Sequence, residues 1–230
     1  MSDGSLLSNE KRNRFRAIVQ PYAAGLARIG LTPNMLTLIG FGIAIAAAVL
    51  AGLELWLAAG IVSVVAGSFD MLDGAVARAT GTSSKFGAFM DSTFDRWGEG
   101  VIYVGIAWGC VNAGYDLAAV LSAAALASAF MVSYARAKEE SLGFPSGGGL
   151  ANVGLAPREV RIVILALGLV ALGAFGGIEM ACGPMFQCPA LLDRRDGSVF
   201  LVLALGLITV LATITTIQRI LHVRAQARKG

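Results

Sequence analysis

Charged residues are scarce in this chain. Only 14% of its 230 residues are Asp, Glu, Lys or Arg, whereas 56% are hydrophobic. A soluble domain of this length would expose more charge at its surface. The charges also gather in clusters that long apolar stretches separate. This distribution argues against a soluble protein and indicates a polytopic membrane protein.

Cysteine and histidine are also rare, with three of the former and one of the latter. They form no zinc-ligand pattern, which argues against a structural zinc site. Cys182 and Cys188 share a short polar loop and form either a disulfide or two free thiols. The sequence has no basic patch interleaved with aromatic residues, so nothing in it indicates a nucleic acid partner. The first thirty residues are too charged for a cleaved signal peptide, and no repeat or linker divides the chain.

Long apolar runs are what the sequence has in abundance. Each run approaches the roughly 20 residues that a helix needs to cross a bilayer core. The spans are predicted near residues 34–53, 56–79, 86–111, 115–140, 157–178 and 198–221. The predicted fold class is therefore all-α, a polytopic membrane protein with six transmembrane helices. These helices are expected to form one transmembrane domain over residues 34–222, and residues 223–230 a basic C-terminal tail.

The N-terminal segment, residues 1–33, has an amphipathic pattern. Within residues 9–30, apolar side chains recur at helical spacing with basic residues between them, namely Phe15, Ile18, Val19, Tyr22, Leu26 and Ile29. We expect an interfacial helix that lies on the membrane surface, because a span follows directly. The alternative is a soluble helix packed on a partner.

The loops of a six-span protein can be oriented by their charge. Both termini and the loops after the second and fourth spans would share one side. Those loops carry Arg78, Lys85, Arg136, Lys138, Arg158 and Arg161. Because cytoplasmic loops are enriched in Lys and Arg, we predict that both termini and these loops are cytoplasmic, in a multi-pass protein of the cell membrane.

Four aspartates mark the end of the second predicted span and the start of the third. Asp70 and Asp73 are three residues apart, and Asp91 and Asp95 are four apart, so each pair shares a helical face. Four acids near a bilayer are costly unless something compensates their charge. One or two divalent ions would do so, and oxygen ligands favour Mg²⁺, Mn²⁺ or Ca²⁺ over zinc. Solvated helix ends paired with nearby bases are the alternative.

These residues resemble the motif of the CDP-alcohol phosphotransferase family. That motif reads D-x-x-D-G-x-x-A-R, then about eight residues, then G-x-x-x-D-x-x-x-D. The matching residues are Asp70, Asp73, Gly74, Ala77, Arg78, Gly87, Asp91 and Asp95. The resemblance implies an enzyme that transfers a phosphate-linked group from a CDP-alcohol to an acceptor hydroxyl and releases CMP.

The same resemblance implies a role for each site residue. Asp70, Asp73, Asp91 and Asp95 would hold two Mg²⁺ or Mn²⁺ ions, and Asp95 would also be the general base. The CDP moiety would lie against Asn34, Thr37, Gly74, Ala77, Arg78 and Ser84. A homodimer is expected from the family and from the small residues on the helix faces.

A second polar cluster consists of basic residues at the end of the fourth predicted span and the start of the fifth, namely Arg136, Lys138, Arg158 and Arg161. The segments around them resemble the branch of the family that makes phosphatidylinositol phosphate. This implies that the four residues bind the phosphate of inositol 1-phosphate as the acceptor, with CDP-diacylglycerol or a similar CDP-lipid as the donor. The order of the first two bases differs from that branch, so glycerol 3-phosphate stays open. The positive-inside rule alone would also place bases here.

Two other classes of protein fit the apolar composition. The aspartates would form a cation path in a cation-coupled transporter, although neither discontinuous spans nor inverted repeats are evident. A non-catalytic membrane scaffold is the other alternative. Neither accounts for the complete motif, and we predict an enzyme of phospholipid biosynthesis.

Overall fold

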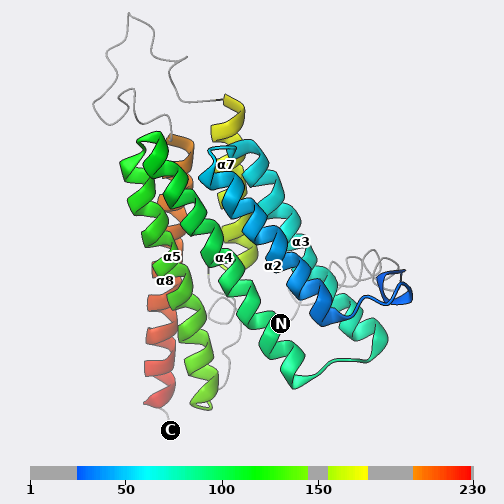
Figure 1. Cartoon of the computed structure of the whole chain (residues 1–230). Helices are drawn as coiled ribbons and strands as arrows, with labels where there is room; N and C mark the ends of the chain where they lie inside the picture. Colours follow the sequence, from blue (N-terminus) through cyan, green and yellow to red (C-terminus); the bar gives the residue numbers. More distant parts are fainter. Residues whose placement is uncertain (1–24, 145–154, 176–198, 229–230) are drawn as a thin grey trace, which may run out of the picture. The chain divides into compact units, whose positions relative to one another are not determined.

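The computed structural model describes residues 25–144, 155–175 and 199–228, and it has no strand among them. Six long helices account for most of this part of the chain, and Figure 1 shows how they run. They are α2 (Pro33–Gly52), α3 (Trp56–Thr80), α4 (Lys85–Ala113), α5 (Asp116–Ser141), α7 (Arg158–Phe175) and α8 (Val199–Ala227). The first five match predicted spans to within three residues at each end, whereas α8 continues six residues past the predicted end at 221 and so includes most of the predicted tail. The all-α prediction is confirmed for the described residues.

Local sequence accounts for where the helices begin and end. Thr32 caps α2, because its hydroxyl accepts the Met35 N–H at 3.3 Å, and Pro33 suits the first helical position since it lacks an N–H. Gly81 follows α3 with a φ of 66°, and Gly114 follows α4 with a φ of 76°. Glycine adopts this left-handed conformation without the penalty of a Cβ, which terminates both helices.

Four of the described helices are long and apolar enough to cross a membrane, namely α2, α3, α5 and α8. The other two coincide with predicted spans but carry more charge. α7 has only 18 residues and begins with Arg158, Glu159 and Arg161. The first half of α4 carries Asp91 and Asp95, two of the four acids of the predicted metal site, together with Lys85 and Arg96. A multi-pass membrane protein is therefore supported, while the full count of six spans stays a prediction.

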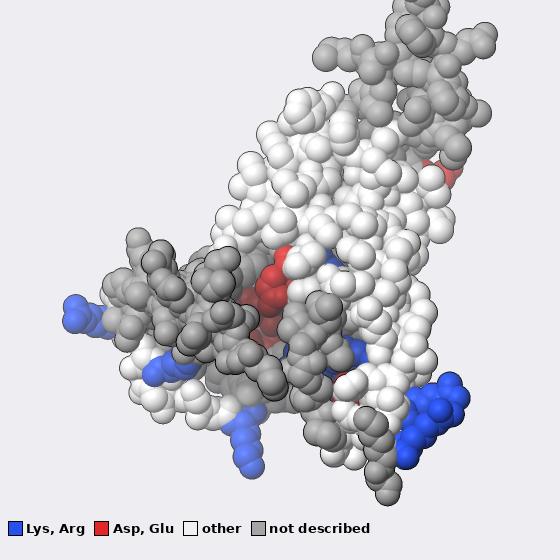
Figure 2. Space-filling model, turned by 180° about the vertical axis from the view of Figure 1, so that it is seen from behind, with Lys and Arg blue, Asp and Glu red and all other residues white. Residues whose placement is uncertain are grey.

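The exposed surface suits a lipid environment. Val120 on α5, Leu167 on α7 and Leu203 on α8 are each more than 60% exposed. Uncharged side chains cover much of the described surface on the face drawn in Figure 2. An apolar surface of this extent is unfavourable in water but favourable in a bilayer.

The chain divides into two compact units. The first comprises residues 1–43 and 65–97, and the second comprises residues 44–64 and 98–230. The start of α2, the end of α3 and the start of α4 belong to the first unit, which therefore contains all four motif aspartates. The second unit contains α5, α7, α8 and the remaining parts of α2, α3 and α4.

Small residues let helices approach closely within the second unit. A Cβ at Gly105 of α4 would overlap the Ala48 carbonyl of α2, and a Cβ at Gly109 would overlap the Ala51 carbonyl. α8 lies beside α5 and also packs against α7 (Figure 1). Close backbone approach through small residues is how membrane helices gain packing energy where the hydrophobic effect is absent.

Two predictions fall outside the described residues. Most of residues 9–30, which carry the predicted interfacial helix, lie outside, and so do Cys182 and Cys188.

Candidate metal and nucleotide site

Three of the four motif aspartates form a group in the first unit. Asp70 from α3 and Asp91 and Asp95 from α4 each present a carboxylate oxygen, and these oxygens all lie within 4.8 Å of one another. The three residues are partly buried. Oxygen ligands sit about 2.0–2.6 Å from Mg²⁺ or Ca²⁺, so two ligands of one ion are at most about 4–5 Å apart. The spacing and the all-oxygen donor set therefore fit a hard divalent cation.

The fourth aspartate, Asp73, has a different environment. It is only 4% exposed, and its Oδ2 accepts a hydrogen bond from the Thr37 hydroxyl at 2.7 Å. This bond joins α2 to α3. A buried carboxylate needs such a donor, because burial without one is costly. Thr37, which the sequence analysis assigns to the nucleotide, thus also fixes an acid of the motif.

A pocket opens beside the aspartates. It has a volume of about 170 Å³, and its lining consists of Pro33, Asn34, Thr37, Asp73, Gly74, Ala77, Arg78, Thr82, Ser83, Ser84, Gly87, Ala88 and Asp91. All six residues expected to contact CDP are in this lining. Asp73 and Asp91 line it as well, so the pocket adjoins the group of acids.

The start of α4 forms one wall of the pocket. Ser84 caps this helix, since its hydroxyl accepts the Gly87 N–H at 2.9 Å. A Cβ at Gly87 would lie 3.1 Å from Ser84 Oγ and 3.3 Å from Asn34 Oδ1. The missing side chain therefore leaves room for both polar groups. A helix N-terminus carries a partial positive charge, which favours an anionic ligand such as a phosphate.

Arg78 lies one helical turn after Gly74 on α3. A Cβ at Gly74 would lie 3.2 Å from Arg78 NH1, so the guanidinium folds back over the glycine. Both residues line the pocket. This places a planar donor group, which suits bidentate phosphate contacts, at the edge of the pocket.

The sequence analysis missed several residues of this site. Thr82 and Ser83 line the pocket between the two halves of the motif, and the run of hydroxyl residues that continues into Ser84 was a signal for them. An aromatic cluster was also missed. Phe41 of α2 packs against Phe94 and Trp97 of α4, with ring centroids 5.0 and 5.1 Å apart. The cluster ties α2 to α4 next to Asp95.

The basic residues predicted for the acceptor all lie in the second unit. Arg136 and Lys138 are exposed near the end of α5, and Arg136 Nε lies 3.0 Å from Glu140 Oε1. Arg158 is the first residue of α7 and is partly buried. An exposed ion pair such as Arg136 with Glu140 contributes little to stability, so a ligand could displace Glu140 from the guanidinium at little cost.

Arg161 differs from the other three. It is only 2% exposed, and its Nε and NH2 atoms donate to Glu99 Oε1 and Oε2, each at 2.7 Å. From the sequence, this side chain is predicted to bind the phosphate of the acceptor. In the structure its anionic partner is a glutamate of the same chain.

Comparisons with known proteins identify similar sequences over most of the chain. A model of the CDP-alcohol phosphatidyltransferase family matches residues 30–189, a range that includes every motif residue. The chain is 34% identical over 231 residues to the phosphatidylinositol phosphate synthase of Streptomyces avermitilis, covering 98% of this chain and 86% of that protein. It is 42% identical over 140 residues to the archaetidylinositol phosphate synthase of Pyrococcus horikoshii, covering 61% and 70% respectively.

The fold also matches solved structures. Phosphatidylinositol phosphate synthase (PgsA1) of Mycobacterium tuberculosis, crystallised with CDP-DAG bound, gives a TM-score of 0.70 at 29% identity, covering 89% of this chain and 92% of that one. The same protein in complex with manganese and citrate also gives a TM-score of 0.70, at 28% identity with 88% and 87% coverage. The fold, the motif and the relatives thus all indicate one family.

Proposed function

Because this chain belongs to the CDP-alcohol phosphatidyltransferase family and is a transferase, we propose that it makes phosphatidylinositol phosphate or a close analogue. It transfers the phosphatidyl-type group of CDP-diacylglycerol or a similar CDP-lipid to a hydroxyl of inositol 1-phosphate and releases CMP. The observation that carries this proposal is the group of Asp70, Asp91 and Asp95 beside the pocket. The inositol acceptor is supported by the relatives, which are named as phosphatidylinositol and archaetidylinositol phosphate synthases.

The acids hold the metal. We assign Asp70, Asp91 and Asp95 to a first Mg²⁺ or Mn²⁺ ion, and Asp73 with Asp91 to the side of the pocket where a second ion would bind. All ligands are carboxylates, which suits these hard cations. Manganese in the complex of the Mycobacterium tuberculosis protein supports a divalent ion of this kind. When bound, the metal neutralises the charge of the pyrophosphate and of the departing CMP.

The donor nucleotide occupies the pocket in this proposal. The start of α4, capped by Ser84, directs its partial positive charge toward a phosphate. Arg78 adds charged hydrogen bonds to the same group. The missing side chain of Gly74 leaves room for the Arg78 guanidinium at this wall of the pocket, and Ala77 adds only a methyl group. Asn34 and Thr37 line the pocket from α2.

Asp95 is the general base in this proposal. The acceptor hydroxyl attacks the β-phosphorus of the CDP-lipid, and its proton passes to the Asp95 carboxylate. A bond forms between the acceptor oxygen and the β-phosphorus, while the bond from that phosphorus to the bridging oxygen breaks, so CMP leaves with that oxygen. Asp95 is assigned this role because it belongs to the group of acids on α4, one turn beyond Asp91, and is not among the residues that line the nucleotide pocket.

The acceptor phosphate is bound by Arg136, Lys138 and Arg158. These residues lie at the end of α5 and the start of α7, and they keep enough exposure to meet a ligand. Arg161 is left out of this set, because Glu99 already occupies its guanidinium. The positive-inside rule alone would place Lys and Arg at these helix ends. In this proposal they have a second role, which is to neutralise the two negative charges of the acceptor's phosphate ester.

The protein is proposed to lie in the cell membrane as a homodimer of six-span subunits. Both termini and the active site face the cytoplasm, since the loops richest in Lys and Arg are on that side of the predicted topology. This orientation also places the acids on the side where a CDP-activated lipid and a water-soluble sugar phosphate meet.

A panel of acceptors tests the proposal. Membranes containing the protein are given CDP-diacylglycerol and Mg²⁺ or Mn²⁺, and CMP release is measured with inositol 1-phosphate, glycerol 3-phosphate, inositol and serine. We expect release with inositol 1-phosphate and little with unphosphorylated inositol. Release with glycerol 3-phosphate alone would refute the inositol acceptor and keep the reaction class. No release with any acceptor, from protein that binds the CDP-lipid, would contradict the whole assignment.

A further inference from the structure

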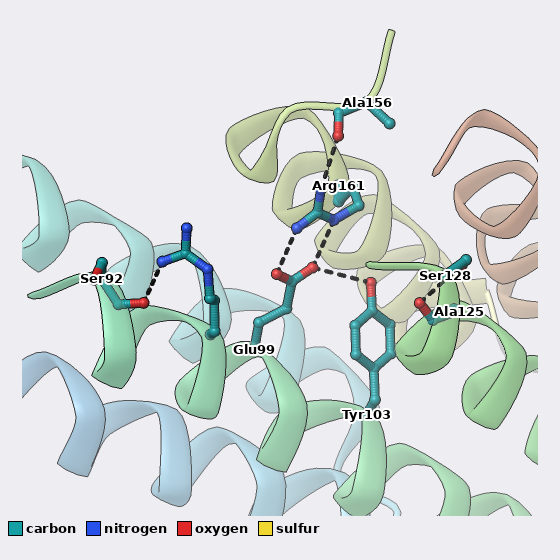
Figure 3. Close-up of polar contacts among 8 residues, drawn as sticks. Ser92, Glu99, Tyr103, Ala125, Ser128, Ala156 and Arg161 are labelled. Carbon is teal, nitrogen blue, oxygen red and sulfur yellow. Dashed lines mark hydrogen bonds and ion pairs between the residues drawn. The ribbon is translucent and has the colours of Figure 1, made fainter. Parts of the chain in front are cut away.

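A network of buried polar groups surrounds the start of α7, and the catalytic assignment does not use it. Glu99 on α4 and Arg161 on α7 form a two-contact ion pair with N–O distances of 2.7 and 2.7 Å (Figure 3). Glu99 is 5% exposed and Arg161 is 2% exposed. The Tyr103 hydroxyl approaches Glu99 Oε1 at 3.5 Å. All three residues belong to the second unit.

The network continues into the backbone that leads to α7. Arg161 NH1 donates to the Ala156 carbonyl at 2.8 Å (Figure 3). From α8, the Thr215 hydroxyl oxygen accepts the N–H groups of Leu155 and Ala156 at 3.1 and 3.2 Å. Its own proton goes to the Leu211 carbonyl at 2.8 Å. Two helices therefore hold the residues before Pro157. Glu99 of α4 acts through Arg161, which bonds the Ala156 carbonyl, and Thr215 of α8 bonds the two N–H groups directly.

These contacts satisfy backbone groups that the fold would otherwise leave buried. Ala156 is fully buried, and a buried backbone group without a partner is costly. Thr215 supplies an acceptor for the N–H groups of Leu155 and Ala156, just before the helix begins, and Arg161 supplies a donor for the Ala156 carbonyl. Glu99 then neutralises the arginine, because an unpaired buried charge is strongly unfavourable.

We propose that Glu99, Arg161 and Thr215 form a latch that fixes the first turn of α7, so that Arg158 is held in position to bind the acceptor phosphate. Arg161 is then a positioning residue and makes no contact with the substrate. This inference rests on the proposed function, in which Arg158 binds that phosphate. Arg158 is the first residue of α7, three positions before Arg161, and so belongs to the turn that the latch holds.

Geometry favours this role over direct phosphate binding by Arg161. Three of its five N–H groups are already used, two on Glu99 and one on Ala156. Only 2% of the side chain is accessible, which leaves no face for a sugar phosphate. Binding substrate would require breaking the ion pair and leaving the Glu99 carboxylate buried without a cationic partner.

Four single variants separate the two roles. In Glu99→Gln and Arg161→Gln the ion pair is lost, and in Thr215→Val the acceptor for the two N–H groups is lost. Thr209→Val is the matched control, because Thr209 also lies on α8 and its hydroxyl donates within the same helix, to the Leu205 carbonyl at 2.8 Å. For each variant we would measure kcat, the KM for the acceptor and the KM for the CDP-lipid.

A latch predicts the same change in the first three variants. The acceptor KM rises about tenfold or more, since misplacing a positioning group by about 1 Å can cost up to about a hundredfold. In these three variants the CDP-lipid KM stays within about twofold of the wild-type value. In the Thr209→Val control, the acceptor KM and the CDP-lipid KM both stay within about twofold of the wild type. Arg161→Lys, which keeps the charge without the two-contact geometry, gives an intermediate acceptor KM. A phosphate-binding Arg161 predicts the opposite for Glu99→Gln, because removing a competing anion would leave the acceptor KM unchanged or lower it.

Hydrogen exchange gives a readout that does not depend on the acceptor. In the wild-type protein the amides of residues 155 and 156 exchange slowly, and exchange quickens in Glu99→Gln and Thr215→Val but not in Thr209→Val. Unprotected amides in the wild type would overturn the latch. If the wild type releases no CMP with inositol 1-phosphate, the proposed function fails while exchange still decides the latch. Should Glu99→Gln not fold, the comparison of Thr215→Val with Thr209→Val decides the proposal alone.

Discussion

Replacing Thr37 with valine removes the hydrogen bond between Thr37 and Asp73 in the candidate site. The Thr37 hydroxyl is the donor to Asp73 Oδ2 at 2.7 Å, and both residues are buried, at 7% and 4% exposed. Hydrogen bonds to charged groups contribute about 1.5–3 kcal/mol, and a buried acceptor left without its donor costs a similar amount. We therefore expect Thr37→Val to destabilise the metal-free protein by about 1.5–3 kcal/mol.

The same change should weaken metal binding. Groups that orient a metal-binding carboxylate typically change metal affinity by about 10- to 100-fold when they are removed. We expect the dissociation constant for Mn²⁺ to rise by at least about tenfold, because Asp73 loses the contact that fixes its side chain. The CDP-lipid KM should rise in parallel, since the pocket adjoins this carboxylate.

The assay compares Thr37→Val with Thr37→Ser, which keeps the hydroxyl. Mn²⁺ binding is measured by titration of the purified protein in detergent, and unfolding is followed by heating with and without the ion. The serine variant should lie close to the wild type. If the valine and serine variants share the same Mn²⁺ affinity and the same unfolding temperature, the bond between Thr37 and Asp73 does not support the site, and the reasoning is refuted.

Three further predictions concern the chemistry. Asp95→Asn should keep the fold and most of the CDP-lipid affinity but reduce kcat by about 10²- to 10⁴-fold, and near-normal turnover would refute the assignment of the base. Removing divalent ions with a chelator should abolish CMP release, with recovery on adding Mg²⁺ or Mn²⁺ but not on adding monovalent salt; continued release would refute metal dependence. Gly87→Ala places a Cβ 3.1 Å from Ser84 Oγ and 3.3 Å from Asn34 Oδ1, so the CDP-lipid KM should rise while the acceptor KM stays constant. A change confined to the acceptor KM would mean that this wall does not bind the nucleotide.

The helical framework was predictable because it depends on local properties. Apolar runs long enough to span a bilayer predicted 34–53 and 115–140, and the structure has helices at Pro33–Gly52 and Asp116–Ser141. Proline and glycine at the boundaries act through their own backbone geometry, which needs no tertiary contact. The family was also predictable, because eight residues within a stretch of 26 match the motif that this chain resembles.

The grouping of the aspartates was predictable only in part. Periodicity places Asp91 and Asp95 on one face of α4, and proximity in the chain favours their approach to Asp70. Periodicity likewise places Asp73 on the same face of α3 as Asp70. In the structure, however, the Asp73 carboxylate accepts a hydrogen bond from Thr37, which is 36 residues away. Spacing along a helix defines a face, but the neighbouring helix decides which residues on that face share a ligand.

The sequence by itself therefore determined the long apolar helices and the acid-rich motif, because both depend on short-range periodicity and composition. Only the tertiary structure decided the partner of Arg161. A base at a helix start is consistent with topology, with phosphate binding or with a buried ion pair, and nothing near it in the sequence distinguishes these. Glu99 is 62 residues away, and it meets Arg161 only because α4 and α7 pack together in the folded unit.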